Sequence, residues 1–359
     1  MEELNTKHLE KNNTNTNDVL VDIPTSREEY LNDNVKTGYG SMNFRLPLPT
    51  NRKAENMRNK LVKLKDRDRS LNLWYLPSYD KEMIKHGKSI KSKTTVFLIH
   101  GSMANGLQYT SIVGDLMKLH YNIVVYDLYG CGASEKPHKY EAYNTLNHLE
   151  DLIAVYNMYN TEENILIGHS YGTSLIGKFI RFREECLTEL KDAHDDHVDK
   201  VDNNKVILLG TAFDMEKGAH PIFKLPVCIL NCLSSYLSDQ FIKLAFSEAT
   251  VEDNKKLMQM YNKENDMTVC KYFYQQFEWA SADEWKALST VDVLILQGKD
   301  DKITPTEKSD ELFHFLQSNQ STNTRKEYKV LDECGHMILM EKSTEISELI
   351  AEFLKDSLE

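Results

Sequence analysis

Five short runs of mainly apolar residues recur along the chain without the alternation of a half-exposed strand. They occupy residues 95–99, 123–126, 165–167, 206–209 and 291–296. A strand that is apolar on both faces has to be covered on both faces, as in a parallel sheet between layers of helices. Helix-like segments, notably residues 146–159 and 173–186, lie between the runs. This alternation predicts an α/β fold with a mostly parallel sheet and helices on both faces.

The segments that flank these runs complete the predicted sheet. Residues 61–65 and 71–76 alternate apolar and polar side chains across a charged turn, which is typical of a hairpin. After the last long run we expect a helix over residues 307–316, a strand over 327–331 and a closing helix over 343–358. The hairpin and the final strand bring the expected sheet to eight strands.

Two stretches depart from this pattern and define the expected domain organisation. Residues 212–286 contain no convincing core strand, but carry amphipathic or aromatic-rich segments at 225–236, 240–246 and 270–279. We interpret them as a helical cap inserted into a core formed by residues 56–211 and 287–359. Residues 1–55 are polar and include an Asn/Thr-rich stretch, so a partly disordered tail is expected there.

Charge and hydropathy exclude several classes of protein. Lys and Arg number 43 against 55 Asp and Glu, and the net charge of −12 argues against a nucleic-acid-binding protein. The mean hydropathy is −0.51, and no apolar run reaches the length of a membrane-spanning helix. The first residues lack the basic-then-apolar pattern of a signal peptide, so a cytoplasmic location is expected.

Neither a metal nor a cofactor is expected. None of the six cysteines forms a CxxC pair, and Cys228 and Cys232 have helical spacing but no nearby histidine. His194 and His197 lie in the charged run at residues 191–204, which we interpret as a solvated loop. The Gly-containing turn at residues 127–134 lacks the Lys-Ser/Thr of a phosphate-binding loop, so a packed turn that shapes the pocket floor is expected.

The sequence Gly168-His169-Ser170-Tyr171-Gly172 follows a predicted strand and precedes a predicted helix. A serine on such a sharp turn exposes its hydroxyl above the sheet, at a helix N-terminus that favours negative charge. Flanking glycines relieve crowding between the strand and the helix. Ser170 is therefore expected to be a nucleophile, with a tight turn of no catalytic role as the alternative.

A nucleophilic serine requires a base and an acid that orients it, in the chain order Ser, acid, His. Asp301 follows the run at residues 291–296 and is the expected acid, with its neighbour Asp300 and the earlier Asp214 as alternatives. After Asp301 only two histidines remain. His314 falls within a predicted helix, so His336, after the last strand, is the expected base.

Backbone donors for an oxyanion are expected in the loops after two strands. We assign the N–H groups of Ser102 and Tyr171 to an oxyanion hole, with Met103 as the alternative donor. His100 and His169 are expected to anchor loops through side-chain hydrogen bonds. In the cap, Tyr272, Phe273 and Phe277 are candidate substrate contacts, although core packing is the default for any single aromatic residue.

Together these motifs resemble the α/β-hydrolase superfamily, over about residues 60–359. The motifs are His100-Gly101, the Asp127 turn, the Ser170 pentapeptide, Gly298-x-x-Asp301-x-x-x-Pro305 and Gly335-His336. Residues 223–234 resemble the cap of the branch that contains the animal abhydrolase-domain-containing protein eight and lysophospholipase-like parasite esterases. The resemblance implies a serine esterase that cleaves small carboxylic esters. Neither a cofactor nor an obligate protein partner is expected. Because the nucleophile is Ser and not Asp, epoxide hydrolysis and dehalogenation are disfavoured.

Two other functions compete with this interpretation. A lysophospholipase or monoacylglycerol lipase would need a long apolar groove and transient contact with a lipid surface, which residues 225–237 of the cap could supply. A non-catalytic binding module on the same fold would show an incomplete triad, whereas here all three residue types are present.

Overall fold

The computed structural model describes residues 60–64, 67–78, 91–192, 203–215, 220–321 and 323–355. The predicted tail at residues 1–55 and the His194/His197 pair lie outside the described residues. The strands in the described part of the chain are β1 (Lys60–Lys63), β2 (Ser70–Leu76), β3 (Thr94–Ile99), β4 (Asn122–Tyr126), β5 (Glu163–His169), β6 (Asn203–Leu209), β7 (Asp292–Gly298) and β8 (Lys326–Leu331).

These strands form one sheet in the order β1-β2-β4-β3-β5-β6-β7-β8. The β1–β2 and β2–β4 pairs are antiparallel, and every pair from β4 to β8 is parallel. At the centre, Leu98 of β3 is in register with Val125 of β4 and with Ile167 of β5. The predicted mostly parallel, eight-stranded sheet is confirmed.

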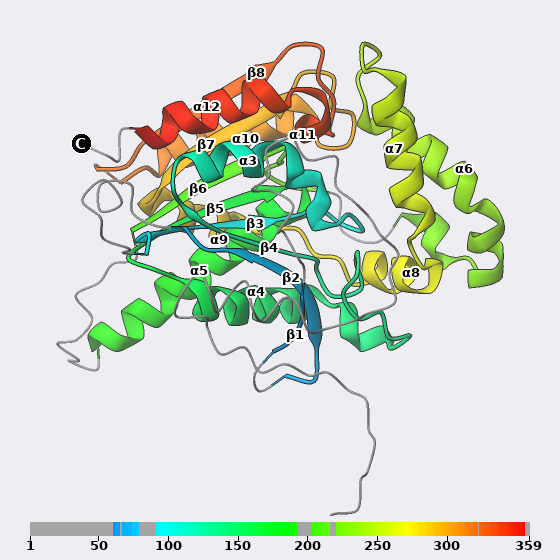
Figure 1. The fold of residues 1–359 in the computed structure, drawn as a ribbon, viewed down its shortest axis with the longest axis horizontal. Helices are drawn as coiled ribbons and strands as arrows, with labels where there is room; N and C mark the ends of the chain where they lie inside the picture. Colours follow the sequence, from blue (N-terminus) through cyan, green and yellow to red (C-terminus); the bar gives the residue numbers. More distant parts are fainter. Residues whose placement is uncertain are drawn as a thin grey trace, which may run out of the picture.

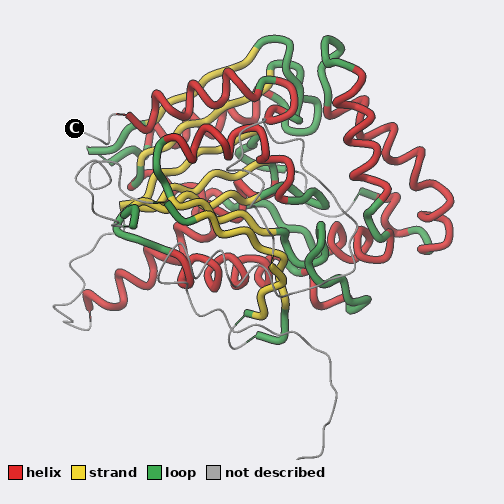
Figure 2. The backbone as a smooth tube through the Cα atoms, viewed as in Figure 1, coloured by secondary structure: helices red, strands yellow, loops and turns green. Residues whose placement is uncertain are grey.

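Helices cover both faces of the sheet, as Figures 1 and 2 show. Phe97 and Ile99 face a core shared with α4, α5, α9 and α10, whereas Val96 and Leu98 face a core shared with α3, α11 and α12. This alternation along β3 explains why its sequence is apolar throughout. The helices of the two layers are α3 (Thr110–Lys118), α4 (Thr145–Tyr159), α5 (Tyr171–Asp192), α9 (Ala282–Ala287), α10 (Thr306–Ser318), α11 (Ile338–Glu341) and α12 (Ser343–Lys355).

The chain between β6 and β7 contains no strand in its described residues. It forms the short 3₁₀ helix η4 (Pro221–Lys224) and the helices α6 (Val227–Ala245), α7 (Glu252–Lys263) and α8 (Met267–Gln275) before α9. Figure 1 places α6, α7 and α8 together at one end of the molecule, on the right of the view. We refer to η4, α6, α7 and α8 as the cap.

Two expectations for the inserted segment differ from the structure. The segments expected at 225–236 and 240–246 form one continuous helix, α6, because residues 237–239 contain neither Gly nor Pro to interrupt it. Residues 282–286, expected to belong to the cap, form α9, which packs against α5 and buries Trp285 completely. Helix α7 lies in a stretch for which no helix is predicted from the sequence pattern.

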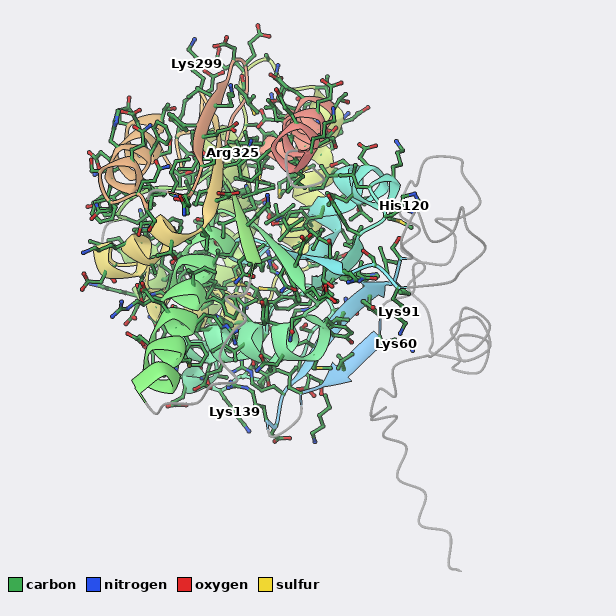
Figure 3. The ribbon with its side chains drawn as sticks, turned by 90° about the vertical axis from the view of Figure 1, so that its left-hand side faces the viewer. Lys60, Lys91, His120, Lys139, Lys299 and Arg325 are labelled. Atoms are coloured by element: carbon green, nitrogen blue, oxygen red, sulfur yellow. The ribbon has the colours of Figure 1, made fainter. Side chains whose placement is uncertain are left out.

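The parallel strands all end at the same edge of the sheet. Figure 3 views the molecule from the side opposite the cap, and its labelled residues Arg325, Lys91 and His120 precede β8, β3 and β4. The loops that follow the strands therefore lie at the opposite edge, toward the cap. In an open α/β sheet, ligand sites form at this carboxyl edge.

Candidate active site

Ser170 occupies the sharp turn between β5 and α5. A β-carbon added to Gly172 would lie 2.1 Å from the carbonyl oxygen of Ile99, and one added to Gly168 would lie 2.7 Å from the carbonyl carbon of Gly172. Any side chain at either position would separate α5 from the sheet. The two glycines are therefore needed because helix, turn and strand approach one another so closely here.

Ser170 has a φ of 51°, in the left-handed region that a serine rarely adopts. Its N–H donates to the carbonyl oxygen of Leu209 at 2.9 Å, and its own carbonyl accepts from the hydroxyl of Thr173 at 2.6 Å. Such backbone strain costs on the order of 1–3 kcal/mol and persists only where neighbouring contacts impose it. Ser170 retains 8% of its surface exposed, against 3% for His169 and 1% for Tyr171.

Asp301 lies in the loop after β7, and both oxygens of its carboxylate accept hydrogen bonds. Its Oδ1 accepts from the N–H groups of Ile303 and Thr304, both at 2.8 Å. Its Oδ2 accepts from the Gln297 amide at 3.0 Å and the Thr304 hydroxyl at 2.7 Å. Burial alone would raise the pKa of Asp301, but the charge of His336 and hydrogen bonds from His336 and Thr304 hold this pKa below its usual value.

The structure brings His336 to this carboxylate. Nδ1 of His336 lies 2.8 Å from Oδ2 of Asp301, and the two side chains are 3% and 0% exposed. A proton on Nδ1 leaves Nε2 free to accept one. Nε2 of His169, the residue before Ser170, lies 2.8 Å from the His336 carbonyl oxygen. The Ser170 hydroxyl and the His336 ring are not hydrogen-bonded to each other here; such bonds often tighten only when substrate binds.

The alternative acids and the alternative base have other partners. Asp300 accepts from the hydroxyl of Ser247 at 2.6 Å, and Asp214 pairs with Lys308 at 2.7 Å. His314 is exposed on α10. Of the candidates considered, Asp301 and His336 are the pair that the structure joins.

Two backbone amides beside Ser170 have no acceptor. Within the described residues, the N–H groups of Ser102 and Tyr171 have no hydrogen-bond partner, whereas the N–H of Met103, the alternative donor, faces the thiol of Cys131. A β-carbon on Gly101 would lie 3.0 Å from the β-carbon of Ser170, so the loop after β3 passes directly beside the serine. Because buried amides are nearly always paired, two unpaired ones here form a candidate oxyanion hole.

The two histidines assigned to loop anchoring do hold loops. Nε2 of His100 accepts from the N–H of Leu128 at 2.8 Å, and His169 bonds to the His336 carbonyl as described. Burial, and then the charge of His336, lowers the pKa of His169 to about 3, so the ring is neutral. The Asp127 turn is packed as expected, since its carboxylate accepts from the N–H groups of Gly106 and Ala133.

The three predicted substrate contacts occupy different surroundings. Phe273 is 1% exposed and packs against His148, Tyr171 and Tyr274. This burial is that of a core residue and not of a pocket wall. Tyr272 meets the ring of Tyr140 edge-on at 5.4 Å, whereas Phe277 is half-buried with its ring 4.8 Å from that of Tyr171.

Several residues that support the site were not foreseen from the sequence. Gln297 and Thr304 hold Asp301, and a Thr three residues after an Asp and just before Pro305 is a turn signal that could have indicated the second. Asn265 and Tyr274 contact the loop after β3, and Glu341 contacts the loop that carries His336. The contacts of Asn265 and Tyr274 are long-range and carry no local sequence signal.

A cavity of about 420 Å³ borders Asp301 but is not lined by Ser170. Charged and polar side chains surround it, including Asp300, Lys302 and Glu307. The described residues contain no group of three or more His, Cys, Asp or Glu arranged to hold a metal ion. Nor does any helix in this part of the chain have the length and apolar character needed to cross a membrane. Cys228 and Cys232 are free and exposed on α6.

Comparison with known proteins decides the family. The alpha/beta hydrolase fold family matches residues 94–343, which is well over half of the chain. The chain belongs to this family. Among curated relatives, Protein ABHD8 of Bos taurus is 30% identical over 271 residues, which are 74% of this chain and 57% of the relative. The chain thus spans little more than half the length of that relative. The predicted resemblance to this branch is confirmed.

Solved structures with the same fold have names that give different activities. An esterase from Exiguobacterium antarcticum superposes with a TM-score of 0.60 at 17% identity, covering 81% of this chain and 98% of the esterase. A bromoperoxidase from Bacillus anthracis gives a TM-score of 0.60 at 17% identity, covering 83% and 100%. At such identities the likeness establishes the fold, and the chemistry has to be argued from the site itself.

Proposed function

We propose that this alpha/beta hydrolase is a serine hydrolase that cleaves carboxylic esters through an acyl-enzyme on Ser170. The observation that carries the proposal is the pair of backbone amides without an acceptor, those of Ser102 and Tyr171, beside Ser170. Such amides are the donors that a tetrahedral intermediate of acyl transfer requires. The Asp301–His336 pair supports the same chemistry, because it supplies an oriented base.

In the first half of the reaction, Ser170 Oγ attacks the acyl carbon while Nε2 of His336 takes its proton. The negative charge that develops on the carbonyl oxygen is stabilised by the N–H groups of Ser102 and Tyr171, with Met103 as the alternative donor. Asp301 accepts a hydrogen bond from the Nδ1–H group of His336 and stabilises the imidazolium. The intermediate then collapses, the ester C–O bond breaks, and His336 gives its proton to the departing alcohol.

In the second half, a water molecule replaces the alcohol. His336 removes a proton from this water as the water attacks the acyl carbon, and the second tetrahedral intermediate releases the carboxylic acid and restores the Ser170 hydroxyl. The chemistry balances as ester plus water giving alcohol plus acid, with no redox step. It uses only side chains and backbone amides of this chain.

A lysophospholipase or monoacylglycerol lipase is the second candidate, favoured by the surface of α6. Its residues 227–238 contain no charged side chain, yet Cys228, Ile229, Cys232 and Tyr236 are exposed. An uncharged exposed face beside the site is suited to transient contact with a lipid surface. The two candidates share the same reaction and differ in the length of the acyl chain.

Labelling with a fluorophosphonate probe tests the nucleophile. The wild-type protein should be labelled and a Ser170→Ala variant should not. A series of p-nitrophenyl esters from acetyl to palmitoyl then separates the two candidates, because a lipase-like enzyme should prefer the long chains. A folded wild-type protein that is neither labelled nor active on any of these esters would instead support a non-catalytic binding module.

A further inference from the structure

The loop that carries two of the candidate oxyanion donors is held by side chains of the cap region. We call residues 101–104 the oxyanion loop. The amide nitrogen Nδ2 of Asn265 donates to the carbonyl oxygen of Met103 at 3.0 Å. The Tyr274 hydroxyl lies 3.2 Å from Oγ of Ser102. Tyr274 is on α8 and Asn265 lies two residues before this helix begins, so one short segment makes both contacts.

Tyr274 is rigidly placed for this contact. Its ring stacks on Phe223 with centroids 4.5 Å apart and an interplanar angle of 22°, and it meets Phe273 edge-on at 5.7 Å. The neighbouring Gln275 ties α8 to η4 by donating to the Phe223 carbonyl oxygen at 2.8 Å. Burial raises the pKa of the Tyr274 phenol, although its hydrogen bond with Ser102 opposes the shift. The hydroxyl therefore stays protonated.

The oxyanion loop does little to hold itself in place. Its internal backbone bond, from the N–H of Ala104 to the carbonyl oxygen of Gly101, is long at 3.3 Å. Met103 has a φ of 52°, which is unfavourable for a residue with a β-carbon. The N–H of Ser102 has no acceptor among the described residues, and the N–H of Met103 faces only the thiol of Cys131, a weak acceptor. A loop with strain and poorly paired donors keeps its conformation only through contacts with its surroundings.

We propose that Tyr274 and Asn265 are positioning residues of the oxyanion hole, which hold the oxyanion loop so that the N–H group of Ser102 stays directed at the reacting carbonyl. The proposal rests on the ester hydrolysis proposed above. The oxyanion exists in the tetrahedral transition state and not in the bound ester. Loosening the loop should therefore lower kcat and leave KM nearly unchanged.

The decisive variant is Tyr274→Phe, which removes one oxygen atom and keeps the stacked ring. We expect kcat for p-nitrophenyl acetate to fall about tenfold, less than the loss of a direct oxyanion donor, with KM within about twofold and an unchanged Tm. Tyr121→Phe is the matched control, since it makes the same change at the residue that precedes β4, at the edge of the sheet away from the cap. It should keep the wild-type kcat.

A second variant tests the contact itself. Ser102→Ala removes the other hydroxyl but keeps the backbone N–H, so it should reproduce the fall in kcat. The double variant should then be no worse than either single one, because both remove the same hydrogen bond. A wild-type kcat in Tyr274→Phe, or fully additive losses, would overturn the positioning role while ester hydrolysis stands. A wild-type protein without activity or fluorophosphonate labelling would overturn both proposals.

Discussion

Oε2 of Glu341 lies 2.9 Å from the backbone nitrogen of Gly335, the residue immediately before His336. The other oxygen of this carboxylate accepts from the N–H of Ser247 at 2.9 Å and from the hydroxyl of Thr250. Both of these residues lie in the connection between α6 and α7 of the cap. One carboxylate thus joins the cap to the loop that carries His336. The backbone N–H of His336 makes a further contact with the cap by donating to the carbonyl oxygen of Ala245, at the end of α6, at 2.7 Å.

Replacing Glu341 by Gln should weaken this contact between the cap and the His336 loop. The variant places an NH₂ group against at least one N–H donor, so a buried bond is lost at a cost of about 1–3 kcal/mol in unfolding free energy. We also expect a lower kcat, because the His336 loop loses a fixed contact. Urea unfolding and ester hydrolysis measure the two effects. Glu345→Gln is the control, since Glu345 is exposed in the first turn of α12; equal behaviour of the two variants would contradict the prediction.

Replacing Ser170 by Ala should leave the protein folded and lower kcat by about 10³-fold or more, because the triad acts as a unit. The unfolding free energy should stay close to the wild-type value, since the side chain loses only its hydroxyl. Hydrolysis of p-nitrophenyl acetate and thermal unfolding measure the two quantities on the same preparation. Near wild-type turnover in a folded variant would exclude the serine mechanism.

Asp301 and Asp300 are neighbours with different partners, so their Asn variants should differ. Asp301→Asn replaces the carboxylate that accepts from His336 by an amide. This change should misorient the imidazole ring and lower kcat by about 10²-fold or more. Asp300→Asn alters a contact with Ser247 and should have a much smaller effect. The kcat values of the two variants decide the matter. A larger loss in Asp300→Asn would show that the acid has been assigned wrongly.

The sheet and the positions of the candidate catalytic residues on it were predictable because local sequence determines them. A buried parallel strand such as β3 must be apolar on both faces, and that requirement is visible in six consecutive residues. The glycines around Ser170 follow equally from the close approach of β5, α5 and β3. Asp301 and His336 could be selected because each follows a predicted strand, and parallel strands bring the following loops to one edge.

The cap contacts were not predictable because they depend on how the inserted segment folds back. Ser102 and Tyr274 are 172 residues apart, and nothing near either residue indicates the other. The position and composition of the inserted segment make Phe273 a candidate substrate contact, with core packing as the default. In the structure Phe273 belongs to the core, because its side of α8 packs against Tyr171. Periodicity shows that a helix has an apolar face, but not which surface that face will cover.

The dependence of activity on pH should reflect His336 and not Asp301. Because the pKa of Asp301 is lowered, this carboxylate stays ionised below the usual aspartate range near pH 4. A protonated imidazole cannot accept the Ser170 proton, so kcat/KM should fall with decreasing pH while the Asp301 carboxylate is still ionised. Rates measured from about pH 8 to about pH 4 in one mixed buffer test the prediction. A flat profile down to pH 5 would indicate a different base.

The same shift makes a prediction about stability. Ionised Asp301 is favoured in the folded state, so it contributes stability above the unfolded pKa, about 3.9, that is lost as pH falls through the lower folded pKa. An Asn side chain cannot titrate. The difference in unfolding free energy between the wild-type protein and Asp301→Asn should therefore be constant above about pH 5 and shrink below pH 4. A difference that is independent of pH would contradict the role of the ionised carboxylate.

The last prediction concerns how the cap sets acyl-chain preference. Phe277 is half-buried beside Tyr171, whose N–H is a candidate oxyanion donor, so it is the aromatic residue best placed to limit the acyl group. Phe277→Ala should shift the preferred acyl length upward, since each additional methylene in such a space is worth about 1–3 kcal/mol of selectivity. The kcat/KM values across the p-nitrophenyl ester series measure this shift.

The other two aromatic residues separate selectivity from packing. Phe273→Ala empties a fully buried position and should cost about 3–5 kcal/mol of stability. Tyr272→Ala should leave the length profile unchanged, because its ring packs against Tyr140 and not against Tyr171. Removing residues 1–50 should also leave the profile unchanged. If Phe277→Ala keeps the wild-type profile while the truncated protein changes it, then acyl length is read by the N-terminal segment, and the cap contributes only the contacts that hold the catalytic loops.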